Sequence, residues 1–112
     1  LSNGNLSLLV DMAKNAGLPW DAVLSGELIQ KYKPDPEVYL MAARLLGCTP
    51  SQLMLVAAHP SDLQAARACG LRTAYVHRAL EFGAEAPARP SRPTGFDLIA
   101  TDFHDLAVQL AA

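Results

Sequence analysis

Three short polar segments carry the side chains of this sequence that are best suited to chemistry. Ser2 and Asn3 precede a predicted helix, where a hydroxyl, an amide and free backbone N–H groups can together bind an anion. Lys33 lies in a loop before a helix that starts with proline, so its ammonium group could reach a site at a strand end. Asp62 follows a buried apolar run, and ligands of open α/β sheets sit at the carboxyl ends of strands. Each signal is weak alone, and their order along the chain makes them a candidate site.

Each of these residues also has a purely structural explanation, which the local pattern leaves open. Ser2 and Asn3 fit an ordinary turn with a helix cap, and Lys33 fits a solvated surface lysine. Asp62, in the first turn of a helix, would stabilise the helix dipole. Tyr39, on the first turn of the helix after Lys33, fits a half-buried core tyrosine. The local sequence therefore assigns no function to any one of them.

His59 follows two alanines at the end of the apolar run and stands directly before a proline. Its imidazole could act as a general base, orient another group, or fill the loop. On local grounds, loop filling is the favoured interpretation.

The elements that must position these residues alternate between strands and helices. Apolar runs predict strands at residues 22–26, 53–57, 72–76 and 97–100. Helical spacing, with proline and glycine at the helix ends, predicts helices at residues 6–16, 36–46, 60–69 and 102–111. Residues 79–95 are rich in Pro, Gly and Ala and predict a long surface loop. The alternation predicts an α/β fold, a Rossmann-like parallel sheet with helices on both faces.

Composition limits the classes of function that remain open. At 112 residues the chain is one domain or less, and its net charge of -2 comes without a cluster of Lys and Arg, which disfavours a nucleic-acid partner. No apolar run approaches the ~18 residues of a membrane helix. Cys48 and Cys69 have neither metal-binding nor redox spacing, which favours reduced thiols in a cytoplasmic protein.

The ordered set of polar residues resembles the haloacid dehalogenase superfamily. A Ser or Thr at a strand end is matched by Ser2, a Lys before a helix by Lys33, and an acidic loop after a hydrophobic strand by "LVAAHPSD". The stretches "LSNG", "YKPDPEVY" and "VAAHPSDLQAARACGLRTAYV" look most like the type II (S)-2-haloacid dehalogenase branch. The resemblance runs over nearly the whole chain.

The resemblance also implies a missing part. The family's nucleophilic aspartate belongs to a first motif that would lie upstream of Leu1, together with a helical cap domain. We therefore expect residues 1–112 to be the C-terminal part of a single, incomplete core domain that lacks its first strand and has no activity alone. In the family that strand lies between the one ending at Ser2 and the one at 53–57, so two apolar strand edges would lack a partner.

By resemblance, the full-length protein would hydrolyse the carbon–halogen bond of short 2-haloalkanoic acids through an aspartyl ester. Ser2 would bind the substrate carboxylate, Asn3 would help to cradle the halide, and Tyr39 would line the carboxylate site. Such an enzyme is expected to work in the cytoplasm as a homodimer.

The same resemblance implies the catalytic groups. Lys33 would keep the nucleophile ionised by charge pairing. Asp62 would orient Lys33 and, with His59, the hydrolytic water. His59 is a variant at its position, and its role is the least defined.

The acidic loop argues against a metal-assisted phosphatase. Phosphatases of the superfamily carry two acids four residues apart there, and these help to hold Mg²⁺. Here the later acid is Asp62, while Ala58 at the earlier position offers no oxygen and His59 offers nitrogen. We therefore expect neither a metal nor another cofactor. A superfamily phosphatase with an altered metal site and a non-catalytic fragment remain the alternatives.

Overall fold

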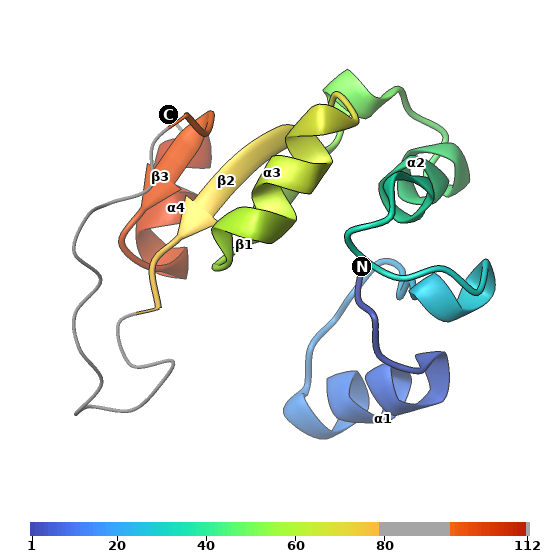
Figure 1. The fold of residues 1–112 in the computed structure, drawn as a ribbon. Coiled ribbons are helices and arrows are strands. Elements are labelled where there is room, and N and C mark those ends of the chain that lie inside the picture. Colours follow the sequence, from blue (N-terminus) through green and yellow to red (C-terminus); the bar gives the residue numbers. More distant parts are fainter. Residues whose placement is uncertain (79–94, 112) are drawn as a thin grey trace, which may run out of the picture.

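The computed structural model describes residues 1–78 and 95–111, and its centre is a parallel sheet of three strands (Figure 1). The strands are β1 (Met54–Ala57), β2 (Arg72–Val76) and β3 (Leu98–Ala100), in the order β1-β2-β3. Both neighbouring pairs are parallel, with Leu55 opposite Thr73 and Tyr75 opposite Ile99. Three of the four predicted strands are thus confirmed, and most of the predicted loop at 79–95 lies outside the described residues.

Four α-helices occupy the positions that the sequence predicts: α1 (Leu6–Ala16), α2 (Pro36–Leu45), α3 (Pro60–Ala68) and α4 (Phe103–Ala111). Short 3₁₀ turns cover Gly26–Leu28 and Pro50–Gln52. The start of α2 follows from its sequence, because Pro36 takes the first turn and the Asp35 side chain accepts a hydrogen bond from the Glu37 N–H at 2.9 Å.

The two faces of the sheet carry separate apolar cores. Tyr75 on β2 packs into a cluster with residues of α2, α3 and β1, whereas its neighbours Ala74 and Val76 pack with Leu106 of α4 on the other face. This alternation is what a strand covered on both sides requires. Figure 1 accordingly shows α3 and α4 on opposite sides of the sheet. The predicted Rossmann-like arrangement with helices on both faces is confirmed.

The predicted strand at residues 22–26 is wrong in its extent. Within the described residues, its pairing is a single parallel bridge between Ser25 and Ser2. The Ser2 N–H donates to the Leu24 carbonyl at 3.1 Å, and the Gly26 N–H donates to the Ser2 carbonyl at 3.0 Å. The chain enters the 3₁₀ turn at Gly26 immediately afterwards, so the pairing ends there.

Within the described residues, β1 pairs with β2 alone, so its other edge has no strand beside it. The Ser2–Ser25 bridge is separate from that sheet. In Figure 1, α1 and the bridged segment stand apart from the three strands. None of the described helices has both the length and the apolar character needed to cross a membrane.

Candidate functional site

Lys33 and Asp62 form an ion pair that joins the loop before α2 to the first turn of α3. Lys33 Nζ lies 2.9 Å from Asp62 Oδ2, and the side chains are 17% and 20% exposed. The start of α2 positions the lysine, and the first turn of α3, after the carboxyl end of β1, positions the acid. Such a partly desolvated pair interacts more strongly than a pair on the open surface. The structure thus brings together two of the predicted catalytic residues.

Tyr39 completes this cluster from the first turn of α2. Its hydroxyl donates to Asp62 Oδ1 at 2.6 Å, so the two carboxylate oxygens bind different partners. Burial, followed by the hydrogen bond to Asp62, raises the pKa of the Tyr39 hydroxyl well above its usual value. The phenol therefore stays a protonated donor. Its side chain is fully buried rather than half-buried, and its hydroxyl is directed at Asp62.

Asn3 contacts the backbone of Lys33 twice. Its Oδ1 accepts a hydrogen bond from the Lys33 N–H at 2.7 Å, and its Nδ2 donates to the Lys33 carbonyl at 3.3 Å. The neighbouring Ser2 Oγ accepts from the Gly4 N–H at 3.1 Å. The predicted substrate-binding turn and the predicted catalytic lysine are therefore directly linked, although their roles stay predictions.

His59 occupies the residue before α3 and is exposed. Its side chain makes no capping hydrogen bond to the helix. Its predicted part in orienting water stays a prediction, as does its structural alternative as a loop residue.

A metal-binding cluster is not found in the described part of the chain, where no group of three or more His, Cys, Asp or Glu side chains could hold an ion. Ala58 offers no ligand atom, and both oxygens of Asp62 already bind Lys33 and Tyr39. The residues present therefore do not fit the two-acid magnesium site of a phosphatase.

Two residues of the site's support were missed by sequence reasoning. Ser25 is fully buried, and its hydroxyl donates to the Gly4 carbonyl while accepting from the Glu27 N–H at 3.0 Å. A Cβ on Gly26 would lie 2.1 Å from the Lys31 carbonyl oxygen, so the lysine loop approaches this backbone closely. The signal was the glycine that ends the predicted strand at 22–26, because a glycine in a strand often marks such an approach.

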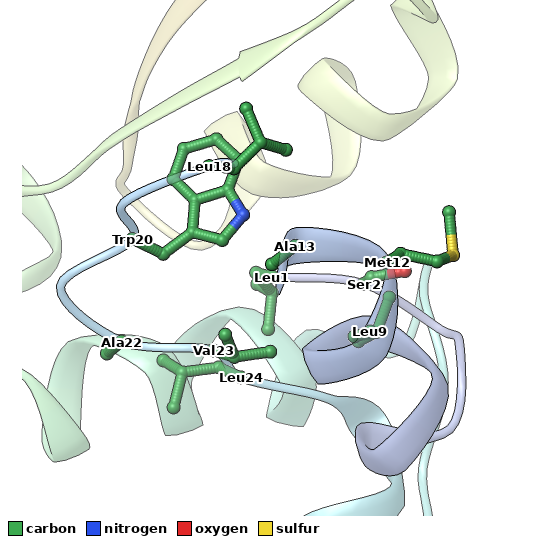
Figure 2. Close-up of a pocket in the computed structure, with 10 residues that line it drawn as sticks. All are labelled: Leu1, Ser2, Leu9, Met12, Ala13, Leu18, Trp20, Ala22, Val23 and Leu24. Carbon is green, nitrogen blue, oxygen red and sulfur yellow. The ribbon is translucent and has the colours of Figure 1, made fainter. Parts of the chain in front are cut away.

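An apolar pocket of about 270 Å³ lies between α1 and residues 18–24 (Figure 2). Leu9, Met12, Trp20 and Val23 are among the residues that line it. Of the predicted site residues, Ser2 also reaches this pocket, whereas Lys33 and Asp62 do not line it.

Comparison with known proteins supports one family. The family model described as haloacid dehalogenase-like hydrolase matches residues 10–76. An (S)-2-haloacid dehalogenase of Xanthobacter autotrophicus is 35% identical over 80 residues, covering 70% of this chain and 32% of the relative. A phosphoglycolate phosphatase of Salmonella paratyphi A is 37% identical over 87 residues, covering 78% and 32%. The chain thus spans about a third of the length of these curated relatives.

Solved structures agree with this assignment. The crystal structure of a defluorinating L-2-haloacid dehalogenase superposes with a TM-score of 0.93 at 50% identity, over 99% of this chain and 45% of that one. The Xanthobacter autotrophicus L-2-haloacid dehalogenase with chloropropionic acid covalently bound gives 0.83 at 27% identity, over 100% and 54%. On the family match, the relatives and the shared fold, the chain belongs to the haloacid dehalogenase-like hydrolases.

Proposed function

We propose that this chain is the C-terminal part of a 2-haloacid dehalogenase core, and that a preceding segment supplies its nucleophilic aspartate. The observation that carries the proposal is the Lys33–Asp62 ion pair, in which Asp62 is the one carboxylate among residues 57–62. A lysine held in this way can stabilise a neighbouring carboxylate anion. This chain spans 45% and 54% of the two solved dehalogenase chains, which leaves room for the rest of the enzyme.

The proposed reaction has two displacements. The aspartate oxygen attacks the carbon that bears the halogen, and the halide leaves with the bonding electron pair. Water then attacks the resulting ester, which releases a 2-hydroxy acid, a proton and the free aspartate. Lys33 keeps the nucleophile ionised, while Asp62 orients the lysine and, with His59, the hydrolytic water. Ser2 binds the substrate carboxylate, and Tyr39 lines the carboxylate site.

A phosphatase is the second candidate, since a phosphoglycolate phosphatase is among the relatives. The experiment measures chloride release from 2-chloropropionate and phosphate release from 2-phosphoglycolate by the full-length protein, each with and without Mg²⁺. Chloride release without Mg²⁺ is the expected result. Phosphate release that needs Mg²⁺, without chloride release, would replace the dehalogenase proposal with the phosphatase.

We also propose a cytoplasmic enzyme that functions as a homodimer. Cys48 and Cys69 are both free thiols, which suits a reducing compartment. The mass of the full-length protein in solution, measured by light scattering, tests the dimer, and a monomeric mass would overturn it.

A further inference from the structure

The side-chain amide of Asn3 makes hydrogen bonds to both the backbone N–H and the backbone carbonyl of Lys33. Asn3 Oδ1 accepts from the Lys33 N–H at 2.7 Å, and Asn3 Nδ2 donates to the Lys33 carbonyl at 3.3 Å. The two residues are 30 positions apart in the sequence. A planar amide that satisfies both backbone groups of one residue restricts where that residue lies. Asn3 thereby fixes the backbone from which the Lys33 side chain extends.

The other end of Lys33 is held as well. Its Nζ is bound to Asp62 Oδ2 at 2.9 Å, and Tyr39 holds the second oxygen of the same carboxylate. The lysine is therefore anchored at its backbone by Asn3 and at its ammonium group by Asp62. Loss of either anchor would leave the long side chain free to sample other rotamers.

The turn that carries Asn3 is itself fixed. The Gly4 carbonyl accepts from the buried Ser25 hydroxyl, and the Ser2 carbonyl accepts from the Gly26 N–H at 3.0 Å. The Gly26 carbonyl in turn accepts from the Lys31 N–H at 3.1 Å. The segment around Ser25 thus contacts both the turn and the lysine loop, so Asn3 belongs to a hydrogen-bonded support and is not an isolated surface amide.

We propose that Asn3 is a positioning residue that acts through Lys33. The inference rests on the proposed dehalogenase function, because it assigns to Asn3 a role in that reaction. This role is separate from the halide contact that the family resemblance implies, and the two make different predictions. A halide ligand affects the breaking carbon–halogen bond, whereas a positioning residue affects whatever Lys33 does.

A double-mutant cycle in the full-length protein separates the two roles. Halide release is measured for the parent, Asn3→Ala, Lys33→Ala and the double variant, with 2-chloro- and 2-bromopropionate. We expect Asn3→Ala to lower kcat about tenfold with both halides, and to add almost nothing when Lys33 is already alanine. Losses that multiply in the double variant would overturn the positioning role.

A second readout needs no catalysis. Hydrogen exchange of the Lys33 backbone N–H, followed by NMR, should accelerate in Asn3→Ala because its acceptor is gone. Asn5→Ala is the matched control, since Asn5 is an exposed asparagine whose side chain makes no capping bond to α1. Unchanged Lys33 exchange in Asn3→Ala would overturn the inference. Faster Lys33 exchange in a protein whose parent releases no halide would overturn the proposed function and leave the link between Asn3 and Lys33 standing.

Discussion

Tyr39 and Lys33 bind opposite oxygens of the same carboxylate. The Tyr39 hydroxyl lies 2.6 Å from Asp62 Oδ1, and Lys33 Nζ lies 2.9 Å from Asp62 Oδ2. The lysine also lies 6.0 Å from the centre of the Tyr39 ring. A fully buried phenol thus sets the orientation of Asp62, and Asp62 sets the position of the ammonium group. In the proposed enzyme, this arrangement presents one fixed positive charge to the nucleophile.

Lys33 and Lys31 should differ sharply in their importance for halide release. Lys33 is paired with Asp62, whereas Lys31 is exposed. Lys33→Ala in the full-length protein should lower kcat on the order of a hundredfold or more, because it removes an electrostatic partner of the transition state. Lys31→Ala is the control and should keep its activity. Equal chloride release from 2-chloropropionate by all three proteins would refute the role of Lys33.

Activity of the full-length protein should survive removal of divalent metal. Ala58 stands where a second acid would be needed, and Asp62 is already bound by Lys33 and Tyr39. The measurement is chloride release after treatment with EDTA, with and without added Mg²⁺. Chloride release that disappears with EDTA and returns with Mg²⁺ would contradict the metal-free mechanism.

The chain of residues 1–112 alone should release no halide. The proposed nucleophile lies outside it, and β1 has one edge without a partner strand among the described residues. An unpaired apolar edge also favours aggregation, so we expect low solubility. Turnover by the purified chain, free of any longer form, would show that the nucleophile lies within it.

The sequence predicted the sheet from local order, whereas the pairing of Lys33 with Asp62 was implied by the family resemblance. Apolar runs, proline and glycine mark the elements, and the parallel topology brings strand ends to one edge. The strand predicted at 22–26 failed because local pattern does not reveal whether a partner strand is present, and Ser25 has one bridge only within the described residues. The Asn3 contacts were also out of reach, since they join a side chain to a backbone 30 positions away.

Tyr39 should make stability depend on alkaline pH. The folded state raises the pKa of its hydroxyl, so the folded protein keeps a proton that the unfolded chain releases above about pH 10. The contribution of the Tyr39 hydroxyl to the free energy of unfolding is therefore complete below about pH 10, and it is lost as pH rises toward the pKa of the folded state. Urea unfolding of the full-length protein across this range should show a smaller alkaline loss for Tyr39→Phe than for the parent.

At neutral pH, Tyr39→Phe should also cost about 1–2 kcal/mol, because the carboxylate loses a buried donor. Tyr32→Phe is the matched control. Because Tyr32 is 47% exposed, this variant should change neither the stability at neutral pH nor its loss at alkaline pH. An identical pH dependence of the free energy of unfolding in the parent and in Tyr39→Phe would contradict the assignment of the alkaline loss to Tyr39.

Gly26 should not tolerate a side chain, because the lysine loop passes against it. A Cβ there would lie 2.1 Å from the Lys31 carbonyl oxygen, and a backbone atom cannot move aside as a flexible side chain can. Gly26→Ala in the full-length protein should lower the free energy of unfolding by about 2–3 kcal/mol. It should also lower kcat, because displacement of Lys31 carries Lys33 away from Asp62.

Gly47→Ala is the control: its φ of +69° makes alanine strained, but nothing lies within 4 Å of the added Cβ. That variant should lose about 1 kcal/mol of stability and keep its kcat. Urea unfolding and chloride release measure both effects, and a Gly26→Ala protein with parental stability and turnover would show that the close approach does not position the lysine.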